Sequence, residues 1–191
     1  LFTTERGTAA QSIRQPITTK PAVALHPDYP NGANDSPDLM VFFGTGKYLE
    51  QTDLSSQDLQ SFYGIWDHGD SSIDRADLQQ QTISNSAITD DEGTLRDDLR
   101  VVDDLSVSYN NKDGWFMDLP ASGERVVVDP GIRGSLVFFN TWIPDSNPCG
   151  AGGTGFLMSI EQANGGAPDD PAFNILGEAL DEYDYVLVND L

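Results

Sequence analysis

The most suggestive chemical motif in the chain is the GTGK run at 44–47, which follows an apolar run at 39–43. A glycine-rich loop of this kind can cradle phosphates when its backbone N–H groups wrap the anion and a hydroxyl after the Lys binds Mg²⁺. Such a loop also needs a glycine five positions before the second glycine, and a Ser or Thr directly after the Lys. Val41 and Tyr48 occupy those two positions. The run therefore does not predict a nucleotide-binding loop.

A second group of chemically active side chains is the acidic stretch DHGDSSIDRAD at 67–77. Its four carboxylates, Asp67, Asp70, Asp74 and Asp77, do not have the spacing of an EF-hand loop, which places acids at positions 1, 3 and 5 and a Glu at 12. We expect a solvated turn in which Asp side chains cap backbone N–H groups, and Ca²⁺ binding is the alternative.

The same stretch contains the tripeptide GDS at 69–71, which is reminiscent of a hydrolase nucleophile. A catalytic Ser needs a His base within hydrogen-bond reach. The chain has two histidines, His26 and His68, and neither lies in a context that indicates a base. The downstream Asp-x-x-His pair of such enzymes is absent. The sequence therefore predicts neither an esterase site nor any other catalytic residue.

Cys149 is the single cysteine, so it cannot form a disulfide within this chain, and it is either free or bonded to something outside it. A CxxC redox site and a cysteine-based zinc site are excluded. The glycines at 150, 152, 153 and 155 do not form a dinucleotide fingerprint, because a strand-like segment and not a helix follows them. We expect a tight connection between two strands.

The composition limits the classes of partner. Ten basic and thirty-one acidic residues give a net charge of −21, which repels nucleic acid and anionic lipid. Scattered acid is typical of a solvated surface, and a Ca²⁺-rich exterior is the alternative. No apolar run approaches the roughly 18 residues of a membrane span. Both ends look cut, so we expect a fragment of a longer protein whose N-terminal domains lie outside this chain.

Short segments rich in Val, Ile, Phe, Tyr and Trp, bounded by Gly, Pro, Asp or Asn, predict strands. They lie at 22–25, 39–43, 61–66, 78–83, 114–119, 124–128, 135–142, 155–160 and 185–188. Helical periodicity is weak, with a polar turn at 55–60 and a second candidate at 171–180. Asp113 and Gly114 read as a hairpin-turn signal. The chain is therefore predicted to be all-β.

An internal repeat refines this prediction. Each half has a Pro-led short strand, then a strand reading VFF-small-Thr, a loop and a third strand, so that 41–45 aligns with 137–141. A repeated all-β unit of this kind predicts a β-propeller, here partial, with roughly two to three blades and insertions. The acidic stretch 88–104 is the predicted insertion. In the first blade, Gly44 and Gly46 permit close backbone packing or a bulge, Thr45 and Tyr48 suit a strand, and Lys47 is a solvated edge charge.

Aromatic side chains fall mainly in the predicted strands. They could form a carbohydrate-stacking platform, but at strand positions core packing between blades is the more frequent role. The side chains concerned are Trp66, Trp115, Trp142, Phe42, Phe43, Phe62, Phe138 and Phe139.

Several segments in one order resemble the PilY1 family, the PilC-type type IV pilus biogenesis and tip-adhesin proteins, in their C-terminal β-propeller. The resemblance covers about 15–161, and its most specific parts are GTGKYL at 44–49, SFYGIWD at 61–67 and the run from GW at 114–115 to CG at 149–150. It implies a large extracytoplasmic protein of a Gram-negative bacterium, often with a von Willebrand A-like adhesive module. Such a protein works with minor pilins at the pilus tip, in pilus extension and in attachment to host or abiotic surfaces.

The family often carries Ca²⁺ loops with alternating Asp or Asn ligands, one of them near the end of the propeller. In the corresponding run of this chain Asn174 and Gly177 remain, but Ile175 and Leu176 replace the carboxylates. Ca²⁺ takes about 6–8 oxygen ligands, so that site is not carried over. We therefore expect a non-catalytic pilus-associated module with no assigned catalytic, cofactor or metal residue. The alternatives are a secreted or periplasmic quinoprotein-like dehydrogenase and a Ca²⁺-binding surface protein.

Overall fold

The structure is a computed structural model, and it describes residues 2, 4–6, 13–29, 39–69, 72–84, 88–89, 95–96, 99–145, 152–169, 172 and 187–188. Short strands dominate it, and its two helices are 3₁₀ turns, η1 (Gln51–Ser55) and η2 (Arg75–Asp77). In the part of the chain that the structure describes, no helix is long enough and apolar enough to span a membrane. Asp70, Ser71, Cys149, the 174–177 run and nearly all of the helix predicted at 171–180 lie outside the described residues.

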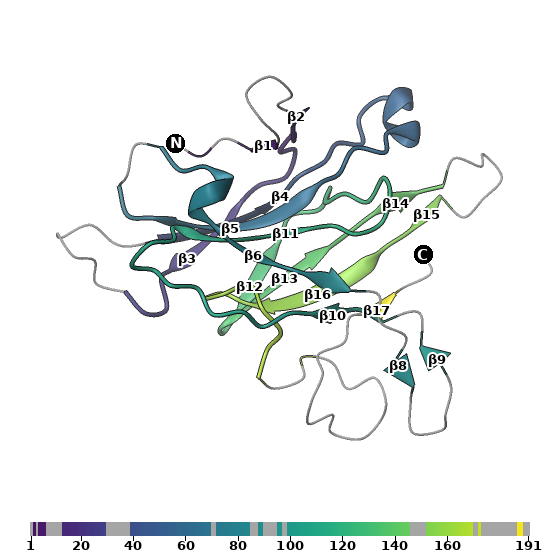
Figure 1. The fold of residues 1–191 in the computed structure, drawn as a ribbon. Coiled ribbons are helices and arrows are strands. Elements are labelled where there is room, and N and C mark those ends of the chain that lie inside the picture. Colours follow the sequence, from purple (N-terminus) through teal and green to yellow (C-terminus); the bar gives the residue numbers. More distant parts are fainter. Residues whose placement is uncertain are drawn as a thin grey trace.

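The first sheet has five strands in the order β3-β4-β5-β11-β6 (Figure 1). The first four pair antiparallel, and β6 adds to the outer edge in parallel with β11. The segments predicted as strands at 78–83 and 114–119 thus both contribute to this sheet. The bounds are β3 (Ala22–Leu25), β4 (Leu39–Gly44), β5 (Ser61–Asp67), β11 (Gly114–Asp118) and β6 (Gln79–Gln81).

The second sheet has four antiparallel strands in the order β12-β13-β16-β17, and it lies next to the first (Figure 1). Its strands are β12 (Gly131–Arg133), β13 (Leu136–Asn140), β16 (Phe156–Glu161) and β17 (Leu187–Val188). Four two-stranded pairs complete the described fold: β1 (Glu5–Arg6) with β2 (Ile13–Arg14), β7 (Ile83–Ser84) with β10 (Val101–Val102), β8 (Ile88–Thr89) with β9 (Leu95–Arg96), and β14 (Ile143–Pro144) with β15 (Gly153–Thr154).

The predicted internal repeat is visible in the structure, because both halves have the same hydrogen-bond pattern. β4 and β13 are each the second strand of their sheet, and each is followed by a buried Thr. The N–H of Thr45 donates to the Ser61 carbonyl at 2.9 Å, and the N–H of Thr141 donates to the Phe156 carbonyl at 2.8 Å. In return each Thr hydroxyl accepts from the N–H of the same partner, at 2.8 Å from Ser61 and 3.1 Å from Phe156. The two halves are therefore one structural unit used twice.

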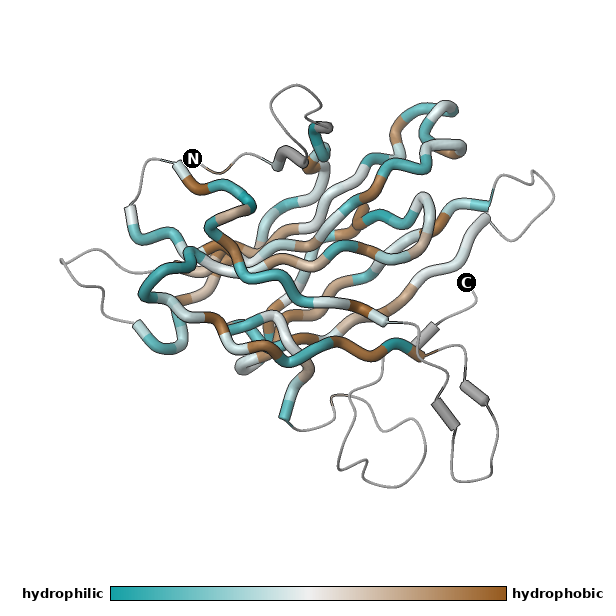
Figure 2. Tube along the Cα trace, viewed as in Figure 1, coloured by the Kyte–Doolittle hydropathy of each residue, from teal (hydrophilic) through white to brown (hydrophobic). Residues whose placement is uncertain are grey.

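The main core lies between the two sheets and draws on one face of each. Phe62 of β5 stacks on Phe139 of β13, with ring centroids 3.9 Å apart and planes at 11°. Figure 2 shows hydrophobic stretches within the strands and hydrophilic ones mostly in the connections. Most of the predicted aromatic core residues are confirmed as buried, namely Phe42, Phe43, Phe62, Phe139 and Trp115. Trp66, Trp142 and Phe138 are only partly buried.

Trp115 is fully buried, and glycines make the space for it. A Cβ atom at Gly64, its register partner in β5, would lie 2.4 Å from the indole, and a Cβ at Gly165 would lie 2.3 Å from it. The indole Nε1–H donates to the Gln162 carbonyl at 2.9 Å. Trp115 thereby joins the first sheet to the turn that follows the third strand of the second sheet.

The predicted strand positions are largely correct, with four corrections. The 124–128 segment is not a strand, because only Arg125 forms a bridge there, to Trp142. The 78–83 segment divides into β6 and β7. The helical turn is η1 and not 55–60. The turn before β11 lies at 109–111, and Gly114 is already in the strand, so it is not a hairpin apex.

The 88–104 segment was expected to be an insertion. Leu99 and Arg100 in its C-terminal part are each 1% exposed, and Val102 is 4% exposed. The end of this segment therefore contributes to the interior.

The glycine contact with Trp115 can be tested by adding one methyl group. We expect Gly64→Ala to destabilise the protein by about 1–3 kcal/mol, because the new Cβ overlaps a fully buried indole. Urea unfolding measures the difference. Gly131→Ala in β12 is the matched control, since no heavy atom lies within 4 Å of its Cβ position. Equal stability of the two variants would contradict the packing argument.

Candidate interaction site

The connection between β4 and β5 is held by one buried guanidinium. Arg125 is 3% exposed and donates only to backbone carbonyls. Its Nη1 bonds the carbonyls of Lys47 at 2.9 Å and Asp53 at 2.7 Å, and its Nη2 bonds the Ser56 carbonyl at 3.0 Å. Its Nε bonds the Gly123 carbonyl at 2.9 Å. Burial lowers the pKa of Arg125, but a guanidinium remains charged at neutral pH.

Close backbone approach brings Arg125 to this position. Gly46 has a φ of 131° and its Cβ position lies 2.4 Å from the Arg125 Cβ, while that of Gly44 lies 2.3 Å from the Val126 Cβ. The expected close packing at these two glycines is therefore confirmed. The Val126 N–H donates to the Thr45 carbonyl at 2.9 Å. Thr45 and Tyr48 lie beyond β4, so the prediction that they belong to the strand is wrong.

Asp53 organises the inside of the same connection. Its carboxylate accepts from the N–H groups of Leu49 at 2.8 Å and Glu50 at 3.0 Å. It also pairs with the Lys47 ammonium at 3.0 Å. The backbone bond from Leu49, then those from Lys47 and Glu50, lower the pKa of Asp53 to about 2. Lys47 was predicted to be a solvated edge charge. Its side chain is 44% exposed, and it also pairs with Asp53, which raises the pKa of Lys47.

The connection held by Arg125 and Asp53 carries exposed apolar side chains at its tip. We call residues 47–56 the β4–β5 loop, and Figure 1 shows it projecting beyond the ends of β4 and β5 (upper right). Leu49 is 76% exposed, more than any other large apolar side chain described, and Tyr48 is 44% exposed. Both line a shallow hollow of about 210 Å³ with Glu50, Gln51 and Leu54. A fixed backbone with exposed apolar side chains loses little entropy on binding, as a contact surface requires.

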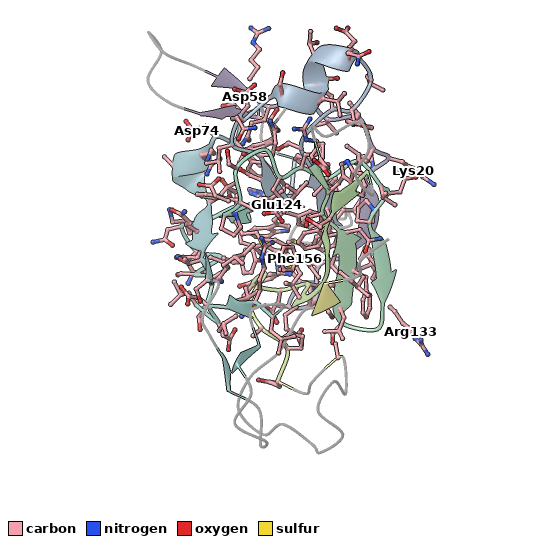
Figure 3. The ribbon with its side chains drawn as sticks, turned by 90° about the vertical axis from the view of Figure 1, so that its right-hand side faces the viewer. Lys20, Asp58, Asp74, Glu124, Arg133 and Phe156 are labelled. Carbon is pink, nitrogen blue, oxygen red and sulfur yellow. The ribbon has the colours of Figure 1, made fainter. Side chains whose placement is uncertain are left out.

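Beneath the loop, a buried ion pair fixes the segment that carries Arg125. Arg100 and Glu124 form a two-pronged pair at 2.5 and 2.9 Å, and their side chains are 1% and 0% exposed. The Arg100 guanidinium lies 3.3 Å from the centre of the partly buried Phe156 ring, and Figure 3 labels Glu124 and Phe156. Glu124 also accepts from the Ala121 N–H at 3.1 Å. The pair thus joins residues of three separate segments.

The residues weighed for catalysis have other partners. His68 bonds Asp113 at 2.9 Å, and His26 is fully buried among aromatic rings. The predicted Asp caps are present, since Asp74 accepts from the Ala76 N–H at 2.7 Å and Asp77 accepts from the Asp74 N–H at 2.9 Å. Within the described part of the chain, no group of three or more His, Cys, Asp or Glu side chains could hold a metal ion.

A second polar cluster lies on the face of the first sheet that points away from the second sheet. Arg75 donates to the Tyr63 hydroxyl at 3.0 Å and to Asp118 at 2.8 Å, and its guanidinium lies 3.9 Å from the centre of the Phe116 ring. The Tyr63 hydroxyl donates to Gln15 at 2.5 Å. Burial raises the pKa of Tyr63. The cluster attaches the N-terminal segment to the sheet, and no sequence pattern predicted it.

Several known proteins are similar to this chain. A Xylella fastidiosa protein described as a type IV pilus biogenesis factor PilY1 homolog is 38% identical over 164 residues, which are 82% of this chain and 10% of that protein. Pseudomonas aeruginosa PilY1 of strain PAO1 is 27% identical over 186 residues, 87% of this chain and 15% of that protein. The chain belongs to the PilY1 family. No protein-family model matches it.

The crystal structure of the Pseudomonas aeruginosa PilY1 C-terminal domain shares the fold. It aligns with a TM-score of 0.74 at 23% identity, over 96% of this chain and 40% of that chain. The two sheets are thus blades of a PilY1-type β-propeller, and the predicted fold is confirmed. The chain spans 10–15% of the length of the PilY1 relatives named above. Both of these relatives are described as type IV pilus biogenesis factors or homologs of one.

The Asp53 framework gives the β4–β5 loop a defined acid sensitivity. The pKa of Asp53 is about 2 in the folded protein and 3.8 ordinarily, so its stabilising effect is complete above pH 4 and is lost as the pH falls toward 2. We expect the Leu49 and Glu50 amide signals in NMR spectra to shift in that window. Asp53→Asn should remove the shift, and Asp103→Asn, at an exposed position, should not. A persisting shift in Asp53→Asn would contradict the assignment.

The buried ion pair predicts a large loss of stability when one partner is neutralised. Glu124→Gln leaves the Arg100 charge buried beside a neutral group, and we expect a loss of about 3–5 kcal/mol in the free energy of unfolding. Urea unfolding of the purified protein measures it. Arg133→Gln, at an exposed position of β12 labelled in Figure 3, should change stability by less than about 0.5 kcal/mol. A small effect of Glu124→Gln would show that the pair is not a major anchor.

Proposed function

We propose that this chain is a non-catalytic interaction module of type IV pilus biogenesis, which contacts minor pilins at the pilus tip and supports pilus extension and attachment to host or abiotic surfaces. Membership of the PilY1 family supports the link to the pilus. The observation that carries the interaction role is the β4–β5 loop, where Arg125 and Asp53 fix the backbone and Leu49 is 76% exposed.

The place of the chain within its protein belongs to the same proposal. We infer that residues 1–191 are part of one C-terminal β-propeller domain in a larger extracellular or outer-membrane-associated protein of a Gram-negative bacterium. An adhesive N-terminal region precedes that domain, and the 88–104 segment is an insertion in the first blade. The match to 40% of the solved PilY1 C-terminal domain supports a propeller that extends beyond these two blades.

The loop can be tested by changing its tip without changing its framework. We expect Leu49→Ser to weaken binding to purified minor pilins about tenfold, as for a residue at the centre of an interface. Cells that carry this variant should show fewer surface pili. The free energy of unfolding should change by less than about 0.5 kcal/mol, because the exposed Leu49 side chain buries little surface in the folded protein.

Leu105→Ser is the matched control, because Leu105 is 47% exposed and lies outside the loop. It should leave minor-pilin binding and surface pili unchanged. Wild-type binding and piliation in Leu49→Ser would refute the proposal for this loop. A loss of both with Leu105→Ser as well would show that general surface hydrophobicity, and not the β4–β5 loop, is responsible.

A further inference from the structure

A cavity of about 250 Å³ lies against the other side of the β4–β5 loop. Its lining includes Lys47 and Ser56 of the loop, Arg14 of β2, and the buried Arg125. Asp58 and Gln60, between the loop and β5, complete the polar lining, and Figure 3 labels Asp58. No sequence pattern indicates this cavity, because its residues come from three segments that are far apart in the chain.

The lining is basic although the protein is strongly acidic. Three of the ten Lys and Arg residues of the chain line this one cavity, against a net charge of −21. Among the described residues of the lining, Asp58 is the single carboxylate, and it accepts from the Ser56 hydroxyl at 3.1 Å. A local excess of positive charge, surrounded by acidic surface, attracts an anion to that point and repels it elsewhere.

Two polar side chains of the lining have hydrogen-bonding capacity that the described residues do not use. Gln60 is 7% exposed, and among the described residues its buried Oε1 has no hydrogen-bond partner. A buried acceptor in that state costs free energy until a donor reaches it. Arg125 uses four of its five N–H groups on backbone carbonyls, which leaves one on Nη2. A matching ligand therefore carries both an acceptor anion and an N–H or O–H donor.

We propose that this cavity binds a carboxylate of a partner polypeptide, with a neighbouring backbone N–H of that polypeptide donating to Gln60 Oε1. The cations Arg14, Lys47 and Arg125 receive the carboxylate. A polypeptide fits better than an acidic sugar, because no aromatic ring of the described residues lines the cavity to stack on a pyranose. The proposal rests on the proposed function as an interaction module, since an acidic residue seated here would lie behind the same loop whose tip carries Leu49.

Small probes test the cavity without the natural partner. The acidic probe is N-acetyl-glutamate N-methylamide, and the neutral probe is the corresponding glutamine compound, both titrated into the whole protein at low salt and followed by NMR. We expect saturable shifts of the Gln60 side-chain amide with the acidic probe, and binding about tenfold weaker with the neutral one. Equal binding of the two probes, or no saturation with the acidic one, would overturn the proposal.

Variants and competing anions sharpen the result. Arg14→Met, at an exposed position, and Gln60→Glu, which adds a negative charge, should each weaken the acidic probe about tenfold, whereas Arg133→Met should not. If Gln60→Glu unfolds the protein, Arg14→Met still decides, and unchanged affinity there overturns the proposal. Galacturonate or inorganic phosphate binding more tightly than the acidic probe would overturn the polypeptide assignment.

The two proposals fail separately. Leu49→Ser should keep the affinity for the acidic probe, because its side chain does not line the cavity. If that variant also keeps minor-pilin binding and surface pili, the proposed function of the loop fails while the cavity assignment stands. If the probe does not bind although Leu49→Ser loses pilin binding, the cavity assignment fails and the function stands.

Discussion

Arg125 is the residue on which the junction between the two blades depends. Its side chain closes the β4–β5 loop, and its backbone exchanges bonds with Trp142 of the second blade, at 2.9 Å from the Arg125 N–H and 2.7 Å to its carbonyl. Each buried carbonyl left without its donor would cost about 1–3 kcal/mol. Only a long, planar side chain with several donors can bond four carbonyls at once, so a Lys at this position could not replace it.

Blade stacking explains why both phenylalanines of each VFF segment are needed. Neighbouring residues of a strand point to opposite faces. In the first blade Phe42 belongs to the core between the sheets, whereas Phe43 packs with Tyr63 on the other face. In the second blade Phe139 is the residue that faces the first blade. A blade with apolar side chains on both faces can stack on either side, which is the requirement of a propeller and is visible in the sequence as adjacent aromatics.

Local patterns predicted most strands, because alternation and turn residues act within a few positions. They failed at 124–128, where high β propensity could not reveal that the partners of Arg125 lie some seventy residues earlier or in the other blade. The glycines at 44 and 46 indicated that another backbone segment packs closely there, but they could not identify it as the segment with Arg125 and Val126. Lys47 and Asp53 are six residues apart, yet their pairing depends on η1, which the sequence analysis placed too far along the chain. Contacts set by topology were therefore the part that sequence could not supply.

The acidity of the chain restricts the binding of an acidic partner to the region of the β4–β5 loop in our proposal. A surface with net charge −21 repels an acidic partner over most of its area, so an attractive site is effective only where cations are concentrated. That concentration lies behind the loop, where Lys47 serves both the loop framework, through Asp53, and the cavity lining. Anchoring through the cavity would fix the register of a partner, and contact with Leu49 would add apolar area to the same interface. One loop, fixed by one arginine, thereby combines an electrostatic and an apolar contact within a surface that otherwise disfavours acidic partners.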